Sequence, residues 1–335
     1  MTKIAINGFG RIGRAAFKIA LDREDIEIVA LNDLTENETL AHLLKYDTVF
    51  GTYDKEVKGS ADGIEVNGKL YKVFEEKEPD KLPWKELEVD IVLECTGRFR
   101  KLEDAELHVK AGAKQVILSA PAKGEGVKSC VIGVNDQEYD YTKDKVMDNA
   151  SCTTNSVAPV MEVLHRNFGV KKATLTTIHS YTSDQNLIDG PHKDLRRARA
   201  AAQNIIPTTT GAAKATGNTI PDLKGVFDGL SVRVPTPNVS LSDLTILIKK
   251  EVTEEEVNNA FKEASESDRY KGIIAVTEEP VVSTDLMGNS HSTIVDLSLT
   301  KVVDGDLLKV IAWYDNEWGY AYRLVDMAER VGKKV

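Results

Sequence analysis

A cysteine at the start of a predicted helix carries the most reactive side chain of this sequence. Cys152 lies in the run from Asp148 to Asn155. Apolar residues follow it with helical spacing, at Val157, Val160, Met161, Leu164 and Phe168. With Ser151 as the N-cap, Cys152 falls in the first turn, where outward-pointing amides and the helix dipole favour a thiolate. The alternative interpretation is a small buried cysteine at a helix start.

A glycine pattern near the N-terminus indicates a dinucleotide site. The strand-like run Lys3 to Ile6 leads directly into a Gly-x-Gly-x-x-Gly sequence, and a helical pattern follows. We expect Gly8 to make the tight turn, Gly10 to let the backbone approach a pyrophosphate, and Gly13 to let the helix pack closely on the strand. The pyrophosphate would bind at the helix N-terminus. A glycine-rich turn in an unrelated α/β protein is the alternative.

An acidic residue follows the next predicted strand. Residues 26–31 form that strand, and Asp33 comes directly after it, where a carboxylate binds a ribose hydroxyl. A carboxylate there repels the additional phosphate of NADP, and Leu34 rather than an arginine follows it. We therefore predict NAD as the cofactor.

A histidine ends the strand that follows the Cys152 helix. Residues 170–178 alternate and are rich in β-branched side chains, which predicts a strand ending at His179. Because the helix runs away from Cys152, this strand can return toward it and bring an imidazole beside the thiol. A hydrogen-bonded histidine with no chemical role is the alternative.

Basic and hydroxyl side chains suggest anion sites in the second half of the chain. The loop-like stretch 180–211 contains Arg197 within a basic run, which favours a phosphorylated ligand or a subunit contact over nucleic acid. Residues 208–211, including Thr210 and Gly211, precede an alanine-rich helix and offer either an anion site or a simple cap. Arg233 lies inside an apolar strand, so we expect a phosphate, a carboxylate or an internal ion pair as its partner.

Strands and helices alternate up to about Ala150, which predicts an α/β, Rossmann-type doubly wound parallel sheet over residues 1–150. Its expected elements are helices at 37–46, with Leu40, Leu43 and Leu44 on one face, and at 101–111, a hairpin at 63–73 that turns at Asn67-Gly68, and strands at 89–95, 115–119 and 129–134. Later strands, such as 241–248 and 307–314, have few helices between them. They predict a second, α+β domain with a mostly antiparallel sheet over 151–316, including a loop at about 180–205.

Composition narrows the functional classes. The net charge of −10 argues against a general nucleic-acid or membrane surface, and no apolar run is long enough to span a bilayer. The chain enters a strand-like run at once, so we expect no signal peptide. Three cysteines without paired spacing argue against a disulfide framework and fit the reducing cytoplasm. Cys95 and Cys130 lie in apolar strand-like runs and are interpreted as core residues, and we predict no metal site.

A dinucleotide, a thiolate and an imidazole together predict oxidation of an aldehyde. Cys152 would add to the aldehyde, while His179 would take the hydroxyl proton and favour the thiolate through its positive charge. The amide of Cys152 offers a donor to the oxyanion. The remaining thioester needs an acceptor, either water or phosphate. The anion candidates Thr210, Arg197 and Arg233 favour phosphate.

These residues stand within seven stretches that resemble phosphorylating glyceraldehyde-3-phosphate dehydrogenase of the glycolytic type. The stretches are 6–14, 119–123, 150–155, 179–182, 207–214, 233–237 and 313–317. They include Ala150-Ser151-Cys152-Thr153-Thr154-Asn155 and Arg233-Val234-Pro235-Thr236-Pro237. The resemblance extends over essentially the whole chain.

The resemblance implies a homotetramer that converts glyceraldehyde 3-phosphate, NAD and inorganic phosphate into 1,3-bisphosphoglycerate and NADH. It implies that Cys152 is the nucleophile and His179 its base. The implied NAD contacts are Arg11, Ile12, Asp33, Lys77, Ser119 and, at the nicotinamide, Asn316. The implied substrate and phosphate contacts are Ser151, Thr153, Thr182, Arg197, Thr210, Gly211 and Arg233. The loop after Ser180 would pack at a subunit interface, and a C-terminal helix at about 317–335 would return to the NAD domain.

Two features qualify this interpretation. Gly190 stands where NAD-preferring members of the family often carry leucine, which weakens the discrimination against NADP, whereas Asp33 with Leu34 still favours NAD. Rival functions are an erythrose-4-phosphate dehydrogenase, a semialdehyde dehydrogenase whose family lacks the 208–211 and Arg233 stretches, and a redox-sensing or binding protein on the same fold.

Overall fold

The computed structural model describes residues 1–334 and divides into two compact units. Unit 1 contains residues 1–130, 138–150 and the chain from Ala321 onward, and unit 2 contains residues 131–137 and 151–320. The last helix, α7 (Trp318–Gly332), crosses from unit 2 into unit 1. Val335, the last residue of the expected C-terminal helix, lies outside the described residues.

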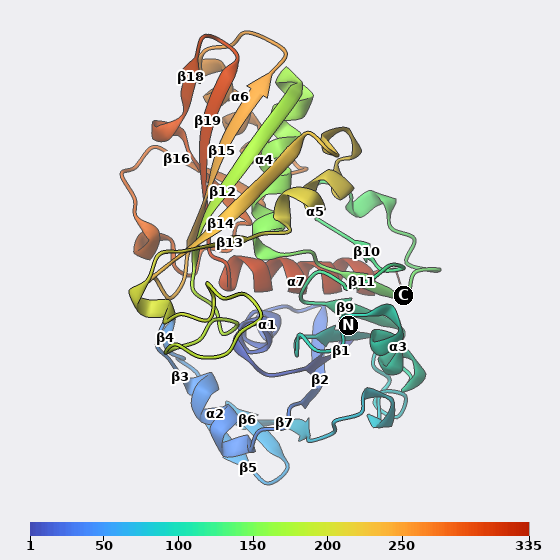
Figure 1. Ribbon diagram of the computed structural model, residues 1–335. Coiled ribbons are helices and arrows are strands. Elements are labelled where there is room, and N and C mark those ends of the chain that lie inside the picture. The colour runs from blue at the N-terminus through green and yellow to red at the C-terminus, as the bar shows by residue number, and fades with distance from the viewer. Residues whose placement is uncertain (335) are drawn as a thin grey trace. The chain divides into compact units, whose positions relative to one another are not determined.

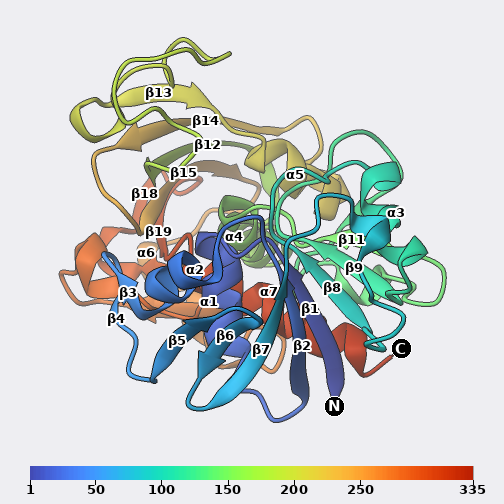
Figure 2. The same ribbon diagram turned by 90° about the horizontal axis from the view of Figure 1, so that it is seen from below.

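Unit 1 is built on a nine-stranded, mostly parallel sheet in the order β10-β11-β9-β8-β1-β2-β7-β6-β5. Figure 2 shows this order from β11 to β5. Neighbouring strands from β10 to β7 are parallel, and the last three form antiparallel hairpins. The strands are β1 (Thr2–Asn7), β2 (Ile26–Asn32), β5 (Val57–Ser60), β6 (Gly63–Val66), β7 (Lys69–Phe74), β8 (Ile91–Glu94), β9 (Gln115–Leu118), β10 (Lys128–Ser129) and β11 (Val146–Asp148). The helices are α1 (Arg11–Ala20), α2 (Asn37–Lys45) and α3 (Leu102–Lys110), and β3 (Tyr46–Asp47) pairs with β4 (Gly51–Thr52) in a separate ribbon.

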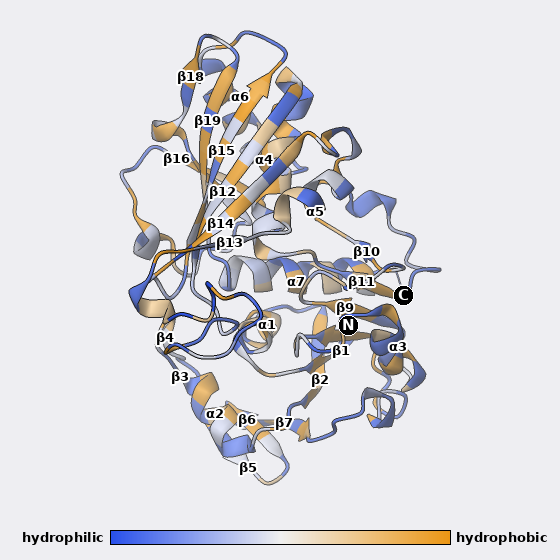
Figure 3. Ribbon diagram, in the orientation of Figure 1, coloured by the Kyte–Doolittle hydropathy of each residue, from blue (hydrophilic) through white to orange (hydrophobic). Residues whose placement is uncertain are grey.

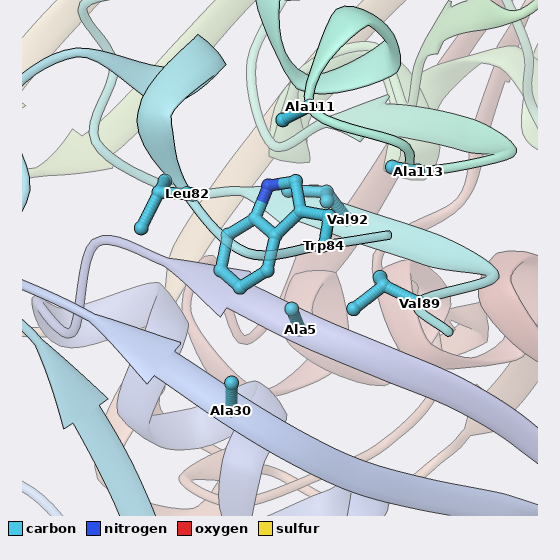
Figure 4. Packing of buried hydrophobic residues seen from close by; sticks show 8 residues of the cluster. All are labelled: Ala5, Ala30, Leu82, Trp84, Val89, Val92, Ala111 and Ala113. Carbon is cyan, nitrogen blue, oxygen red and sulfur yellow. The ribbon is translucent and has the colours of Figure 1, made fainter. Parts of the chain in front are cut away.

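The order strand, glycine turn, helix, strand follows from local sequence. Apolar strands β1 and β2 are buried and pair in parallel, which requires a crossover, and α1 supplies it. The Asn67-Gly68 turn joins β6 and β7 with φ values of 49° and 79°, the left-handed region that a two-residue hairpin needs. Figure 4 shows part of the core, where Trp84 lies among alanines and valines of the central strands and neighbouring loops.

Unit 2 contains an eight-stranded, mostly antiparallel sheet in the order β13-β14-β12-β15-β19-β17-β16, with β18 beside β19 (Figure 1). Only the β12–β14 and β16–β17 pairs are parallel within the described sheet. The strands are β12 (Val170–Ser180), β13 (Ile206–Thr209), β14 (Phe227–Val234), β15 (Ser240–Ile248), β16 (Ile274–Thr277), β17 (Thr293–Asp296), β18 (Lys301–Val303) and β19 (Leu307–Tyr314). The helices are α4 (Cys152–Phe168), α5 (Ala212–Thr219) and α6 (Glu254–Glu266). Both sheets confirm the predicted fold class.

Apolar residues concentrate on strands such as β1 and β19, whereas the stretch between β12 and β13 is mostly polar (Figure 3). The long helix α4 packs on strands of the second sheet and is apolar along its buried side. Its burial holds the first turn, and therefore Cys152, in a fixed place. Among residues 1–334, no helix has the length and apolar character that crossing a membrane requires.

The structure corrects three predictions of local structure. The strand expected at 129–134 ends at Ser129, because the side chains of Asn135 and Asp136 accept the amides of Val131 and Gly133 and fold this segment into turns. Leu43 is 39% exposed, since the buried stripe of α2 follows Asn37, Leu40, Ala41 and Leu44. The stretch 180–211 is not entirely loop, because β13 pairs with β14.

Candidate active site

In unit 2, the thiol of Cys152 and the imidazole of His179 meet. Cys152 begins α4, His179 is the next-to-last residue of β12, and Sγ lies 3.5 Å from Nε2. The other ring nitrogen, Nδ1, lies 2.7 Å from the carbonyl oxygen of Ser180. A carbonyl only accepts, so the proton of the neutral ring is on Nδ1 and Nε2 presents its lone pair to the thiol. The ring therefore has the tautomer that a base acting on Cys152 requires.

Burial opposes charge on both members of this pair. It raises the pKa of the Cys152 thiol, against the lowering effects of the Arg233 charge and of the Thr153 hydroxyl and nearby amides. Burial, followed by the Arg233 charge, lowers the pKa of His179 to about 3, although the Ser180 carbonyl acts in the opposite direction. Burial therefore acts against the thiolate and the positive imidazole that the sequence predicts, and the ionised pair stays a prediction. A helix N-terminus and an imidazole lower a thiol pKa only if their effect exceeds the cost of desolvation.

Sheet register brings Arg233 beside His179. The parallel strands β12 and β14 place His179 opposite Arg233. The guanidinium Nη1 donates to the Ser180 carbonyl at 3.2 Å and to the Thr182 hydroxyl at 3.1 Å. These acceptors are neutral, so they do not neutralise the positive charge of Arg233, and a phosphate partner for it stays a prediction. The site thus holds a positive charge beside a thiol and a base.

A turn after β12 connects Arg233 with a second arginine. Arg197 Nη1 lies 2.6 Å from Asp184, and its Nε lies 3.0 Å from the Thr208 hydroxyl. The charge of Arg197 reaches far enough to lower the pKa of both His179 and Arg233. The structure therefore gathers Thr182, Arg197 and Arg233 into one region, called here the cationic region, in which Arg197 is paired with Asp184 and Asp194 whereas the hydrogen-bond acceptors of Arg233 are neutral.

Two helix N-termini carry the remaining predicted substrate residues. Ser151 caps α4 by accepting the Thr154 amide at 3.0 Å, as predicted for an N-cap. Thr210 accepts the Ala212 amide at 3.2 Å at the start of α5, and Gly211 precedes that helix. Gly211 is the N-cap of α5 and Thr210 accepts the first helical amide, so neither the capping nor the anion interpretation of Thr210 is decided, and its anion role stays a prediction.

Tyr314 is a site residue that the sequence pattern did not reveal. Its hydroxyl lies 2.8 Å from the Thr153 hydroxyl and 2.9 Å from that of Thr177, and its ring contacts His179 edge-on. Tyr314 is 1% exposed, so it holds the residue after Cys152 on one side and the His179 strand on the other. The aromatic end of β19 was the available signal, but 161 residues separate Tyr314 from Thr153.

Asn316, two residues later, also connects to the His179 strand. Its Oδ1 accepts the Ser240 hydroxyl at 2.7 Å, and Ser240 Oγ accepts the Ser180 amide at 3.1 Å. The amide oxygen of Asn316 is therefore oriented by β15 and β12.

A cavity of about 280 Å³ lies at the carboxyl ends of the parallel strands of unit 1. Its lining residues are Asn7, Gly8, Gly10, Asn32, Asp33, Leu34, Glu76, Lys77, Cys95, Thr96, Arg98 and Phe99. A Cβ on Gly8 would lie 2.6 Å from the Thr96 amide nitrogen, and one on Gly13 would lie 2.1 Å from the Gly8 oxygen. At Gly10 nothing lies within 4 Å of that position, so the backbone is open to a ligand. These residues fit a dinucleotide in the manner that the glycine pattern predicts.

The other predicted cofactor residues divide between the cavity and its surroundings. Asp33 accepts the Phe9 amide at 2.7 Å, and Lys77 is exposed at the cavity wall. Arg11 and Ile12 are on α1 and are not among the lining residues, and Arg11 pairs with Asp47 at 2.6 Å. Ser119 does not line the cavity either, but its hydroxyl hydrogen-bonds Cys95.

The interpretation of Cys95 as a simple core residue needs correction. Cys95 follows β8, is partly exposed and lines this cavity, because β8 ends one residue earlier than predicted. Cys130 is buried, as expected. Within residues 1–334, no three His, Cys, Asp or Glu side chains are grouped so as to hold a metal ion.

A dinucleotide-binding sheet and a separate unit with a cysteine–histidine pair define the class of protein, a nicotinamide-dependent oxidoreductase. Comparison with known families narrows this class. The model of the glyceraldehyde 3-phosphate dehydrogenase NAD-binding domain matches residues 2–102, and that of the C-terminal domain matches residues 151–316. This chain belongs to the glyceraldehyde-3-phosphate dehydrogenase family.

Individual relatives match over their full length. The chain is 55% identical to glyceraldehyde-3-phosphate dehydrogenase of Geobacillus stearothermophilus, covering 99% of this chain and 98% of that protein. It is 54% identical to glyceraldehyde-3-phosphate dehydrogenase 1 of Bacillus cereus, covering 100% and 99% of the two chains. With glyceraldehyde-3-phosphate dehydrogenase 1 of Bacillus subtilis it shares 53% identity, covering 99% and 98%. The resemblance predicted from the motifs is confirmed, as is an NAD-binding domain.

Proposed function

We propose that this chain carries out the oxidative phosphorylation of glyceraldehyde 3-phosphate with NAD, using Cys152 as the nucleophile and His179 as its base. Membership of the family supports the reaction. One observation of this structure supports the two roles most strongly. Nε2 of His179 lies 3.5 Å from the Cys152 sulfur, and the Ser180 carbonyl at Nδ1 leaves Nε2 as the accepting nitrogen of the neutral ring.

The proton transfers follow from that geometry. Sγ adds to the aldehyde carbon while the thiol proton passes to Nε2 of His179 and on to the new hydroxyl. Burial disfavours the charged form of both groups, so in this proposal the proton transfer accompanies the attack of the sulfur. Nε2 then takes the hydroxyl proton while the thiohemiacetal is oxidised to a thioester. Inorganic phosphate attacks the thioester carbonyl, the carbon–sulfur bond breaks, and the acyl phosphate leaves. The released sulfur takes back the proton held on Nε2, which restores the thiol and the neutral imidazole.

NAD supplies the hydride acceptor when it is bound. Gly8, Gly10 and Asp33 hold it in the unit 1 cavity in this proposal, and Asn316 holds the nicotinamide. Five further residues support the same site in this proposal. They are Arg11, Ile12 and Gly13 on α1, Lys77 at the cavity wall, and Ser119 directly after β9.

The cationic region of unit 2 binds the phosphate groups. Arg233 provides positive charge beside neutral acceptors, and the Thr182 hydroxyl orients its guanidinium. Arg197, which pairs with Asp184, is the second proposed phosphate contact. Ser151, Thr153, Thr210 and Gly211 contribute hydroxyl or amide donors at the two helix N-termini. This charge matters because the whole chain carries a net charge of −10, so an anionic substrate needs a local attraction.

The test is NADH absorbance with glyceraldehyde 3-phosphate and NAD, with and without inorganic phosphate. We expect sustained turnover only with phosphate, and without it a brief burst that stops at the thioester. Steady turnover without phosphate would mean that water is the acceptor and would overturn the phosphorylating reaction. No NADH from this substrate, but NADH from erythrose 4-phosphate, would reassign the substrate.

We further infer a homotetramer located in the cytoplasm. Leu187, Ile188, Leu195 and Ile205 are each more than 70% exposed in the stretch between β12 and β13, and apolar surface of this kind is typical of subunit contacts. Cys152 forms no disulfide in the structure, and a reactive thiol persists in a reducing compartment.

A further inference from the structure

A buried acid and a buried histidine lie behind the wall of the unit 1 cavity, and the proposed mechanism uses neither. Glu94 ends β8 and is 2% exposed, and His108 on α3 is fully buried. Glu94 Oε2 lies 3.1 Å from His108 Nε2. Neither residue lines the cavity.

Trp84 fixes the protonation pattern of this pair. Its indole Nε1 lies 3.0 Å from His108 Nδ1. An indole N–H only donates, so Nδ1 accepts, and the ring carries its proton on Nε2, which donates to Glu94. The Trp84 ring is fully buried in the apolar cluster of Figure 4 and cannot turn its N–H away without disturbing that packing.

On its other side, the carboxylate begins a chain of amides. Asn7 Nδ2 donates to Glu94 Oε2, and Asn7 Oδ1 accepts from Asn32 Nδ2 at 2.7 Å. The Asn32 amide then makes two bonds with the backbone of Glu76, accepting its N–H and donating to its carbonyl, each at 2.9 Å. A backbone N–H and C=O cannot exchange roles. The direction of donation is therefore fixed at this end as well as at Trp84.

The second carboxylate oxygen holds a further segment. Glu94 Oε1 accepts both the amide of Thr96, at 2.7 Å, and its hydroxyl. Four residues of this network line the cavity, each at the end of a different strand. Asn7 and Asn32 end β1 and β2, and Glu76 and Thr96 follow β7 and β8. One carboxylate with four donors thus connects the segments that form the cavity wall.

We propose that Glu94 is a positioning residue for the dinucleotide, acting through Asn7, Thr96 and the Asn32–Glu76 pair. This inference rests on the proposed function, in which the dinucleotide binds in the unit 1 cavity. Stability alone is a weak reason to bury a carboxylate, because apolar replacements of similar volume are often as stable. What an apolar group cannot do is orient four donors at once.

The test is Glu94→Gln in the full-length chain. Glutamine keeps the shape but places an NH₂ group against donors whose directions are fixed at both ends. We expect the Kd for NAD, measured by titration calorimetry, to rise about tenfold or more. The KM for NAD should rise in parallel, while kcat at saturating NAD stays within about twofold of the wild type. A merely structural carboxylate would lower thermal stability without this division between KM and kcat.

Glu162→Gln is the matched control. Glu162 is also buried and pairs with Arg166 at 2.6 Å and Arg269 at 3.1 Å, but it lies in unit 2 and does not line the cavity. This variant should lose thermal stability and keep the wild-type Kd for NAD.

Trp84→Phe provides a second test that keeps most of the ring volume. Without the indole N–H, His108 is no longer fixed, and we expect the Kd for NAD to rise about threefold. If Glu94→Gln does not fold, the Kd of Trp84→Phe for NAD tests the positioning role on its own. Wild-type NAD affinity in every folded variant overturns the positioning role. A wild-type chain that itself binds no NAD would overturn the proposed function instead.

Discussion

The tautomer of His179 determines what the Cys152 site can do. Nδ1 donates to a backbone carbonyl and Nε2 faces the sulfur, so the imidazole can accept a proton without first turning or losing one. Arg233 adds positive charge beside the thiol and the imidazole. At the residue scale, the proposed chemistry therefore depends on proton transfer between Sγ of Cys152 and Nε2 of His179.

Replacing the nucleophile tests this site most directly. We expect Cys152→Ser to lower the rate of NADH formation by about three orders of magnitude or more, because a hydroxyl is a much weaker nucleophile than a thiol. Calorimetric titration should still show NAD binding, because the cavity lies in unit 1. Activity near that of the wild type would contradict the covalent mechanism.

The depressed pKa of His179 predicts a pH effect on stability. The pKa falls from 6.5 in the unfolded chain to about 3 in the folded protein. Between these values only the unfolded chain binds the proton, so acidification favours unfolding by about 1.4 kcal/mol per pH unit from this group. We expect His179→Asn, which does not titrate there, to lose less free energy of unfolding than the wild type between pH 6.5 and 4. Urea unfolding at several pH values measures it, and parallel losses would refute the prediction.

Asp33 has two roles that a pair of variants separates. Its Oδ2 accepts the Phe9 amide at 2.7 Å, and its charge opposes the NADP phosphate. Asp33→Ala should raise the ratio of kcat/KM for NADP to that for NAD about tenfold or more. Asp33→Asn keeps an acceptor for the Phe9 amide but not the charge, and should shift the ratio with a smaller loss of NAD affinity. An unchanged ratio in both variants would exclude a role in cofactor choice.

At the scale of elements, the turn between β1 and α1 contains glycines with different functions. Gly13 allows helix and turn to approach, whereas Gly10 has φ −72° and open space where a Cβ would be. Gly13 therefore allows close packing, and Gly10 allows a ligand to approach the backbone.

Alanine substitutions should separate these functions. Gly10→Ala should keep the free energy of unfolding within about 1 kcal/mol of the wild type but weaken NAD binding strongly, because the methyl group would lie where the pyrophosphate approaches. Gly13→Ala should lower the melting temperature, because its Cβ would lie 2.1 Å from the Gly8 oxygen. Thermal melts and NAD titrations measure both effects. The assignment fails if Gly10→Ala binds NAD normally.

At the scale of the whole molecule, two units divide the work. Unit 1 provides the dinucleotide cavity, and unit 2 provides the thiol, the imidazole and the cationic region. The exposed apolar residues between β12 and β13 belong to unit 2 and are explained by the proposed assembly.

The assembly is testable by a double variant of that surface. Leu187 and Leu195 are each 81% exposed, so Leu187→Asp with Leu195→Asp should leave the fold intact. If they pack against another subunit, the added charges should shift the mass measured by light scattering from that of a tetramer to a smaller species. Leu70→Asp, at a 46% exposed leucine of unit 1, is the control. A tetramer that persists in the double variant would remove this surface from the interface.

Local patterns in the sequence determined most of the elements. Several features depend only on neighbouring residues and can therefore be predicted without knowledge of the fold. They are the glycine turn, the Asn67-Gly68 hairpin, the Ser151 cap and the alternation of strands and helices. The strand predicted at 129–134 was wrong beyond Ser129, because the side chains of Asn135 and Asp136 accept backbone amides that a strand would need for its ladder. The motifs also identified Cys152, His179, Arg197 and Arg233 as the residues to examine.

Only the tertiary structure decided how these residues meet. The 3.5 Å contact of Cys152 with His179, the register that places Arg233 beside His179, and the place of Tyr314 all join residues that are distant in the chain. The same is true of the Glu94 network and of the pKa directions, because desolvation depends on everything packed around a group. Sequence patterns record preferences of neighbours, whereas distances and burial result from the packing of the whole unit.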